Sequence, residues 1–218
     1  MCCVSAAFGE TAAQLLARAK TQADPNAQIK LLTRAVAKSP RMADAYHYRA
    51  DAYLNLGRYK QALEDYSRTV SLRPRDPFRY YARALAYQKM GRPSLAQADL
   101  TKAISLKPAY RNFYLARARA NASLGKYEDS LVDYQKYLGR RKPAPAIAEE
   151  LVPVYLGAYR YEAAQKQVSA LQAAGNDTAD VHFWQGRVLS GQNRLDEAVS
   201  AYSKAINRDE GYAQAYRY

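Results

Sequence analysis

A gapless repeat of 34 residues is the sequence feature that most constrains the fold of this chain. Residues 43–76 align with residues 77–110 without an insertion. The alignment places like residues on one another at five kinds of position: Tyr46 on Tyr80, Arg49 on Arg83, Ala50 on Ala84, Gly57 on Gly91 and Pro74 on Pro108. A fixed period of this length indicates stacked supersecondary units, each burying its apolar face against its neighbours.

The order of aromatic, small, glycine, alanine, aromatic and proline residues resembles the tetratricopeptide repeat, a helix–turn–helix unit. Apolar or small side chains recur at three- and four-residue spacing, which is typical of amphipathic helices. Gly57 and Gly91 fall at the turn between the two helices, where a left-handed residue ends a helix at little cost. The resemblance implies an all-α fold, a right-handed superhelical solenoid of six helix–turn–helix repeats.

Extending the frame in both directions divides the chain into six units without an insertion. The predicted units are 9–42, 43–76, 77–110, 111–144, 145–178 and 179–212. Residues 1–8 form a lead-in, and residues 213–218 begin a truncated seventh repeat in which Tyr216 falls in the place of Tyr46. A solenoid normally ends on a polar helix face. The apolar end therefore indicates either a fragment of a longer repeat protein or an end that packs on another molecule, self-association included.

The pattern departs from the repeat between the fourth and fifth units. The run from Gly139 to Pro145 replaces the closing proline, Val152 takes the close-contact position of Ala50, and Pro153 falls inside a predicted helix. An interior proline costs about 3 kcal/mol relative to alanine and usually kinks or breaks a helix. We therefore expect an irregular seam here, with Pro153 as a break or hinge.

The charge balance is strongly basic, with 33 Lys and Arg against 20 Asp and Glu and a formal net charge of +13. Such an excess favours anionic partners, namely nucleic acid, an acidic polymer or a membrane surface. The basic residues are nevertheless spread over the repeats, as on a solvated surface without any anionic partner, and we favour this interpretation. No apolar run reaches the roughly 18 residues of a transmembrane helix.

Neither a catalytic set nor a cofactor or metal site is predicted. The two cysteines, Cys2 and Cys3, are adjacent, and the chain has two histidines, so neither a disulfide framework nor a structural zinc site is expected. His47 and Asp51 lie one helical turn apart but have no accompanying nucleophile. We therefore expect a protein that is not an enzyme.

The chain contains twenty tyrosines, and aromatic side chains between basic residues can form a stacking surface for single-stranded nucleic acid. Thirteen of the tyrosines fall at four recurring repeat positions, where a ring fills the space between adjacent helices. These are Tyr46, Tyr80, Tyr114 and Tyr216; Tyr53, Tyr87 and Tyr155; Tyr59, Tyr127 and Tyr161; and Tyr66, Tyr134 and Tyr202. We therefore predict that these tyrosines pack in the core, and that nucleic acid is a less favoured partner than protein.

In the tetratricopeptide family the first helix of each repeat lines a concave groove. The resemblance implies groove positions at Asp44, His47, Asp51, Asn55, Phe78, Tyr81, Leu85, Gln88, Asn112, Leu115, Arg119, Phe183 and Arg187. An extended peptide or a helix could lie in such a groove, with apolar anchors for affinity and charges for register. The lysines and asparagines with which some family members clamp a terminal carboxylate are absent, so we reject that activity. A merely solvated groove is the alternative.

Two further basic features each have a structural and a functional interpretation. Arg49, Arg83 and Arg117 recur once per unit and could bind phosphate or carboxylate groups, or could pack beside the tyrosines. We favour packing. The cluster Arg140, Arg141 and Lys142 is either a docking loop for an anionic surface or the solvated loop of a degraded repeat. We favour the solvated loop.

The segment Met1–Gly9 resembles the tail of a secretory signal in its small residues, but it lacks a basic region and an apolar core. We favour a cytoplasmic protein over a periplasmic or secreted one. Taken together, the sequence predicts a scaffold that binds a peptide or helix of a partner protein in a concave groove. The alternative is a basic module that binds RNA, an acidic polymer or a membrane surface.

Overall fold

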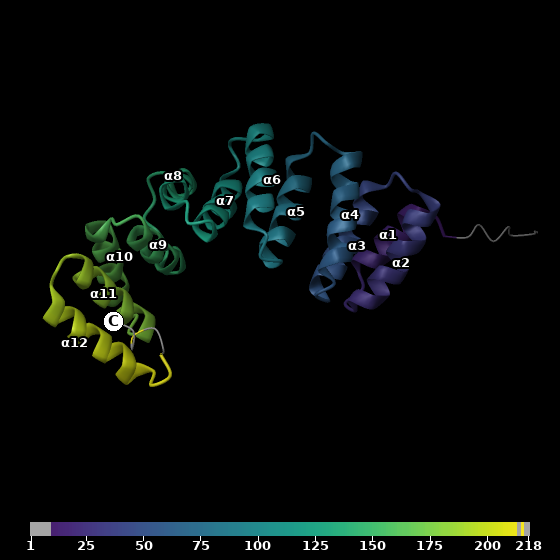
Figure 1. Ribbon diagram of the computed structural model, residues 1–218. Helices are drawn as coiled ribbons and strands as arrows, with labels where there is room; N and C mark the ends of the chain where they lie inside the picture. Colours follow the sequence, from purple (N-terminus) through teal and green to yellow (C-terminus); the bar gives the residue numbers. More distant parts are fainter. Residues whose placement is uncertain (1–9, 213–214, 216–218) are drawn as a thin grey trace, which may run out of the picture. The chain divides into compact units, whose positions relative to one another are not determined.

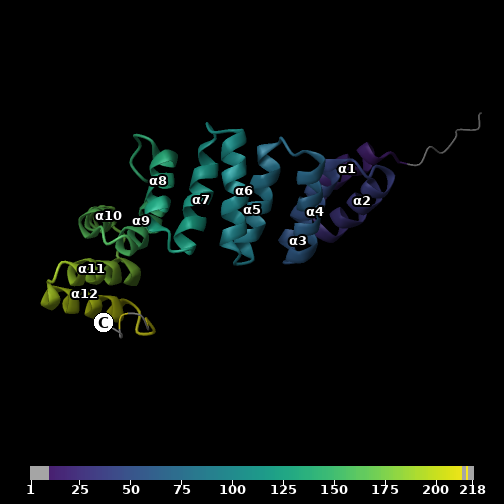
Figure 2. The same cartoon turned by 45° about the horizontal axis from the view of Figure 1, so that its top comes forward.

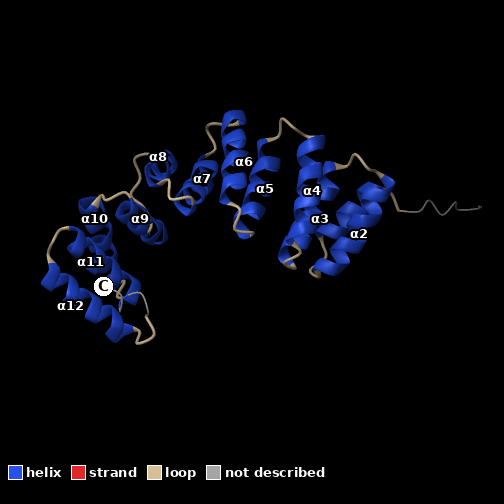
Figure 3. Cartoon of the chain, in the orientation of Figure 1, coloured by secondary structure: helices blue, strands red, loops and turns tan. Residues whose placement is uncertain are grey.

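The computed structural model describes residues 10–212 and Ala215, and these residues contain twelve α-helices and no strand (Figures 1 and 3). The predicted lead-in, residues 1–8, lies outside the described residues. So does the predicted seventh helix with Tyr216, except for Ala215.

The helices alternate in pairs along the chain. Their bounds are α1 Ala12–Lys20, α2 Pro25–Lys38, α3 Ala43–Asn55, α4 Tyr59–Leu72, α5 Pro77–Lys89, α6 Pro93–Leu106, α7 Arg111–Ser123, α8 Tyr127–Leu138, α9 Pro145–Gly157, α10 Tyr161–Ala173, α11 Ala179–Gly191 and α12 Leu195–Arg208. From α4 onward, every helix begins 34 residues after the helix two places before it. The predicted all-α helical repeat fold is confirmed.

The chain divides into two compact units, residues 1–120 and residues 121–218, with the division inside α7. In the first unit, α3 to α6 lie side by side (Figures 1 and 2). Its interior uses small residues at the closest approaches, with Ala50, Ala62 and Ala84 fully buried. In the second unit, Val152 replaces the small residue at the position of Ala50 and packs with Val168 in a cluster between α9, α10 and α11, where Ala164 keeps the position of Ala62.

From α3 onward, the turn between the first and the second helix of each repeat contains a residue with positive φ. Gly57 and Gly91 supply it at φ values of 69° and 66°, as predicted, because a residue without Cβ adopts this conformation freely. In the last two repeats the same position is held by Tyr159 and Asn193, at 57° and 62°. A left-handed conformation is tolerated by asparagine but is strained for tyrosine.

The predicted break at Pro153 is wrong, because α9 runs without interruption from Pro145 to Gly157. Pro153 lies on an exposed face, while Leu151, Val152 and Val154 on either side of it are buried. Burying an aliphatic side chain contributes about 1.5–3 kcal/mol. The buried face of α9 therefore offsets the roughly 3 kcal/mol that an interior proline costs.

The tyrosine prediction is confirmed in full for one repeat position and in part for the others. Tyr66, Tyr134 and Tyr202 are buried in the core. The described rings at the other three positions are half-buried, except Tyr59, which is 37% exposed. Those rings lie between helices with one edge in solvent, as amphipathic side chains commonly do.

The recurring arginines form an arginine ladder (Arg49, Arg83 and Arg117) that ties helices together in the first unit. The Arg49 guanidinium donates to both carboxylate oxygens of Asp65, at 2.7 and 2.8 Å, and Arg83 donates to both oxygens of Asp99, at 2.7 Å each. Such two-pronged charge-assisted bonds are strong and geometrically specific. Arg49 and Arg83 also lie beside tyrosine rings, at 5.5 Å from Tyr46 and 5.9 Å from Tyr87, so the packing interpretation is confirmed for them, but their guanidiniums are paired with aspartates and are not exposed.

A second set of ladder bonds crosses from each repeat to the one before it. Arg49 donates to the Thr33 hydroxyl at 3.2 Å, Arg83 to the Ser67 hydroxyl at 3.3 Å, and Arg117 to the Thr101 hydroxyl at 3.2 Å. Each hydroxyl lies on the second helix of the preceding repeat. The ladder thus fixes the spacing between successive repeats as well as the fold within one.

Candidate functional site

The first helices of the second and third repeats enclose a hollow of about 540 Å³, which we call the α3–α5 hollow. It is lined by Asp44, His47, Tyr48, Asp51, Leu54, Tyr66, Asp76, Phe78, Arg79, Tyr81, Ala82 and Leu85. Six residues that the family resemblance implied are therefore brought together here: Asp44, His47, Asp51, Phe78, Tyr81 and Leu85.

Two of the carboxylates in the hollow are satisfied by arginines. Arg79, which is buried, donates to Asp44 at 2.5 Å and to Asp76 at 3.1 Å. Arg73 adds a bond to Asp44 at 3.2 Å. Asp76 also caps the first turn of α5 by accepting a bond from the Phe78 backbone N–H. This network leaves little negative charge at its end of the hollow.

Asp51 is in a different situation. Its Oδ1 accepts a bond of 2.5 Å from the Tyr66 hydroxyl, and its Oδ2 lies 3.7 Å from His47 Nε2. Burial raises the pKa of Tyr66, with the Asp51 charge acting in the same direction, so the hydroxyl keeps its proton. The Asp51 side chain is 42% exposed and can accept further bonds from the hollow.

His47 does not neutralise Asp51 at neutral pH. Burial lowers the pKa of His47 below its ordinary value, and the positive charge of Arg79 acts in the same direction. The charges of Asp51, Asp44 and Asp76 act in the opposite direction but do not outweigh burial. His47 is therefore neutral at pH 7, and Asp51 presents an anionic oxygen beside it.

The other side of the hollow is apolar and aromatic. Phe78 is 39% exposed and packs edge-on against Tyr110 and Phe113, at ring distances of 5.1 and 5.6 Å. Half-buried Tyr81 and Leu85 continue this surface along α5. Burial raises the pKa of Tyr81, so its hydroxyl is neutral. The hollow thus combines an apolar floor with one carboxylate lacking a charged partner.

The remaining predicted groove residues do not join this hollow. Asn55, Asn112 and Arg119 are exposed, and Leu115 is half-buried. Gln88 donates to the Ala116 carbonyl oxygen at 2.7 Å and thereby links α5 to α7.

The two predicted groove residues of the sixth repeat lie in the other unit. Arg187 is half-buried. The prediction for Phe183 needs correction, because its ring is only 5% exposed and packs against Tyr202 and Tyr212 in a hydrophobic cluster.

Several residues of the hollow were missed by the repeat positions of the family groove. Arg79 and Asp76 belong to the start of α5, and Tyr66 comes from α4. No repeat position indicated that Arg79 would reach back to Asp44 in the preceding repeat.

The predicted basic loop follows α8 and leads to α9. Arg141 bonds to the end of α8, donating to the carbonyl oxygens of Leu138 at 3.2 Å and Tyr137 at 2.9 Å. A cation at these carbonyls is favourable because they carry the negative end of the helix dipole. Arg140 and Lys142 are exposed, and within the described part of the chain neither forms an ion pair.

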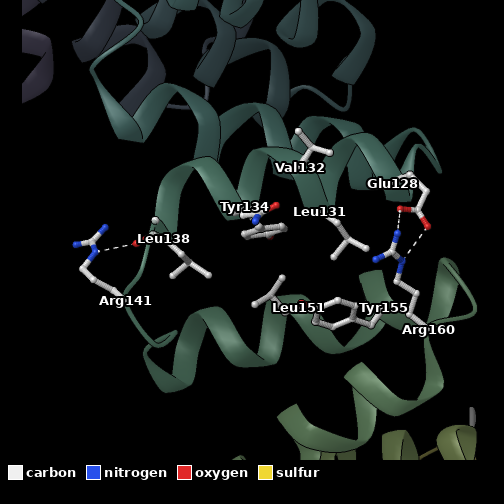
Figure 4. A pocket seen from close by; sticks show the side chains of 11 residues that line it. Glu128, Leu131, Val132, Tyr134, Leu138, Arg141, Leu151, Tyr155 and Arg160 are labelled. Atoms are coloured by element: carbon white, nitrogen blue, oxygen red, sulfur yellow. Dashed lines mark hydrogen bonds and ion pairs between the residues drawn. The ribbon is translucent and has the colours of Figure 1, made fainter.

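Beside this loop lies a second concavity, which we call the α8–α9 cleft, with a volume of about 410 Å³ (Figure 4). It is lined by Glu128, Leu131, Val132, Tyr134, Gln135, Leu138, Gly139, Arg141, Leu151, Tyr155 and Arg160.

No group of three or more His, Cys, Asp or Glu side chains among the described residues could hold a metal ion. No helix in the described ranges is long and apolar enough to cross a membrane.

Comparison with known families identifies the class of the chain. Residues 81–145 and 150–214 match the model of the "Tetratricopeptide repeat" family, and residues 31–64 match a second model of the same description. Residues 50–91 match a third model, described as "TPR repeat". The chain belongs to the tetratricopeptide repeat family, and its architecture is that of a protein–protein interaction scaffold.

Several solved structures share the fold. YrrB, described as "a TPR protein with an unusual peptide-binding site", superposes with a TM-score of 0.73 at 16% identity, covering 85% of this chain and 96% of its own. PilF from Pseudomonas aeruginosa gives 0.70 at 17% identity, with 94% of each chain covered. PilW, described as a type IV pilus biogenesis factor, gives 0.69 at 16% identity over 94% and 95%. No curated protein sequence matches the chain.

Proposed function

We propose that this protein is a non-enzymatic scaffold that binds a peptide or helical segment of a partner protein in the α3–α5 hollow. The observation that carries the proposal is the geometry of the hollow, in which the 42% exposed Asp51 carboxylate lies at the edge of an apolar floor that includes Phe78 and Leu85. The fold relative YrrB is described as having a peptide-binding site, which supports this class of ligand without locating it in this chain.

The chemistry of the hollow defines the segment that fits it. Phe78, Tyr81 and Leu85 offer apolar surface to an aliphatic or aromatic side chain. Asp51 offers a hydrogen-bond acceptor to a lysine or arginine one or two turns away. A binding segment therefore combines apolar anchors with a basic residue, the anchors supplying affinity and the charge supplying register.

A random peptide library displayed on phage tests this proposal with the whole chain as bait. We expect selected peptides to combine Lys or Arg with Leu, Ile or Phe. Asp51→Asn keeps the shape and the acceptor for Tyr66 but removes the charge, and Leu85→Asp spoils the floor. Each should weaken binding of a selected peptide about tenfold or more.

Matched controls come from outside the hollow. Asp196→Asn changes an exposed carboxylate on α12, and Leu95→Asp changes a leucine on α6 that is 45% exposed. Both should leave binding unchanged. Selected peptides that lack basic residues, or that bind all four variants equally, would refute the assignment of the hollow.

A further inference from the structure

The α8–α9 cleft lies where the arginine ladder is interrupted. In the repeat frame, Leu151 on α9 holds the position that Arg49 and Arg83 hold in the first unit. Leucine lacks the guanidinium that elsewhere reaches across to the second helix of the preceding repeat. The space next to Leu151 opens as a cleft of about 410 Å³ instead.

The neighbours of the missing guanidinium are partly retained. Tyr155 corresponds to Tyr53 and Tyr87, whose rings lie 6.0 and 5.9 Å from the ladder guanidiniums. The ladder carboxylate is not retained, because Gln167 stands at the position of Asp65 in this repeat. The cleft therefore offers aromatic and aliphatic surface but no carboxylate equivalent to that of the ladder.

Part of each wall of the cleft is apolar, although Glu128, Gln135, Arg141 and Arg160 also line it. Leu131 and Leu138 from α8 face Leu151 and Tyr155 from α9 across the gap (Figure 4). Leu131 and Leu151 are almost fully buried, whereas Leu138 and Tyr155 are half-buried. Leu138 lies at the Arg141 end of the cleft and Tyr155 at the Arg160 end (Figure 4), so an apolar side chain packed against either one would remove apolar surface from water.

The rim of the cleft is positively charged. At one end, Arg160 and Glu128 neutralise each other through two bonds, at 3.0 and 2.6 Å. At the other end, the Arg141 guanidinium bonds only to neutral carbonyl oxygens, so its charge is not cancelled. Exposed Arg140 and Lys142 flank it. A basic rim attracts carboxylates and repels a cationic side chain.

We infer that the α8–α9 cleft docks an acidic segment of a partner protein, with an aliphatic side chain against Leu138 and Leu151 and carboxylates facing Arg140, Arg141 and Lys142. The site differs from the α3–α5 hollow in its residues and in the sign of its charge. It does not depend on the function proposed for that hollow.

Fluorescence polarisation with three synthetic peptides tests the inference on the full chain. The first peptide places one leucine among glutamates, the second replaces the leucine by serine, and the third replaces the glutamates by lysines. We expect the first peptide to bind about tenfold tighter than the second, which lacks the anchor, and the third not to bind.

Four variants locate the site. Leu138→Ser removes the half-buried wall, and its control Ile206→Ser changes the equivalent repeat position on α12. Arg140→Glu/Lys142→Glu reverses the rim, and its control Arg68→Glu reverses an exposed arginine on α4. Each cleft variant should weaken binding of the acidic leucine peptide about tenfold while its control does not. Circular dichroism checks that all four remain folded.

A double substitution that restores the arginine–aspartate pair of the ladder in the fifth repeat should fill the cleft while keeping the other side chains that line it. Leu151→Arg/Gln167→Asp restores the arginine–aspartate pair of the first unit, and its guanidinium should occupy the cleft. Peptide binding should then be lost.

Three results would overturn the inference. Equal binding of the serine and leucine peptides would indicate a general polyanion surface. Preference for the lysine peptide would show that the rim charge has the opposite effect. A dimer in sedimentation that Leu138→Ser dissolves would make a second copy of this chain the occupant. The variant Leu85→Asp, which alters the floor of the α3–α5 hollow, should still bind the acidic leucine peptide. This result distinguishes the two sites.

Discussion

In the first unit each ladder arginine joins its own repeat to the one before it through charged hydrogen bonds, whereas in the second unit Leu151 and Gln185 stand at the same repeat positions. The Gln185 amide exchanges bonds of 3.1 Å with Gln165, and Leu151 forms no polar contact of this kind. Aliphatic residues such as Val152, Val168 and Leu171 fill the second interior. One repeat frame thus supports two kinds of contact between repeats, one polar and directional and one apolar.

The difference also bears on binding. The polar unit has its concavity on the first helices, where an acidic residue faces an apolar floor. The apolar unit has its α8–α9 cleft where the polar contact is missing, with a basic rim. The net charge of +13 describes neither site, because the local charges have opposite signs at the two sites. Four experiments test whether the two units differ in this way.

The largest expected effect follows from removing one ladder arginine. Arg83→Leu leaves Asp99, whose side chain is 10% exposed, without its cation, and we expect a loss of about 3 kcal/mol in the free energy of unfolding. Urea denaturation followed by circular dichroism measures it. Arg83→Leu/Asp99→Leu should recover much of the loss, because no buried charge is then unpaired. Equal losses in the single and double variants would contradict a polar origin of the contact.

A cavity in the second unit should have a slightly smaller effect. Leu171→Ala removes a side chain that is 1% exposed in the α9–α11 cluster, at a cost of about 2.5 kcal/mol. Added salt should leave this loss unchanged, whereas it should alter the Arg83→Leu loss by screening the remaining charge. The same urea titrations at low and high salt decide whether the two units differ as described.

The left-handed turns provide a smaller test with opposite signs in the two units. Gly91→Ala should cost about 1 kcal/mol, because a residue with Cβ is strained at a φ of 66°. Tyr159→Gly relieves the same strain at 57° and should gain about 0.5 kcal/mol after the entropy of glycine is subtracted. Asn193→Gly is the matched control and should be nearly neutral. A destabilised Tyr159→Gly would show that the exposed ring contributes more than the strain costs.

The smallest effect is the pH dependence that His47 contributes. Its pKa is lowered in the folded chain, so below the ordinary value of about 6.5 the unfolded chain binds a proton that the folded chain does not. Stability from this group is therefore complete above pH 6.5 and falls as the pH decreases toward the folded pKa. Unfolding free energies between pH 7.5 and about 5 should fall less for His47→Asn than for wild type. An unchanged slope would contradict the burial of His47.

His182 is a useful comparison for that titration. Burial lowers its pKa as well, with Lys204 acting in the same direction, and its Nε2 lies 2.5 Å from Asp177 Oδ1. His182→Asn should also flatten the pH profile.

The repeat frame predicted the fold because the helices from α3 onward recur with one period of 34 residues. With such a period, one repeat of the sequence can be aligned with the next without any other information. Gly57, Gly91 and Tyr66 were placed correctly for this reason. Six hollow residues could be identified from the family pattern, since they lie on the same face of α3 and α5. The family pattern gave wrong predictions for residues whose surroundings in this chain differ from those in a typical repeat. Phe183 is buried by Tyr202 and Tyr212, and Pro153 is tolerated because the rest of α9 is buried.

Other features could not be read from a single position. The pairing of Arg79 with Asp44 depends on how far one repeat lies from the next, and the α8–α9 cleft depends on an arginine that is absent. The lowered pKa of His47 depends on burial by residues from several helices. Each is a property of three-dimensional neighbours, whose distances are set only when the repeats are stacked.

The arginine ladder has a consequence for how such a chain can grow. From the preceding repeat, each ladder arginine needs only a hydroxyl group. In a tandem duplication of residues 43–76, the Arg49 of the second copy could therefore donate to the Ser67 of the first copy, as Arg83 does. The first unit can thus be lengthened by whole repeats without redesigning a junction. In a tandem duplication of residues 145–178, the Leu151 of the second copy would stand opposite the Gln165 of the first copy. Leucine cannot form the amide hydrogen bond that Gln185 forms with Gln165. Expansion of the array is therefore expected to be easiest among the repeats that carry the ladder.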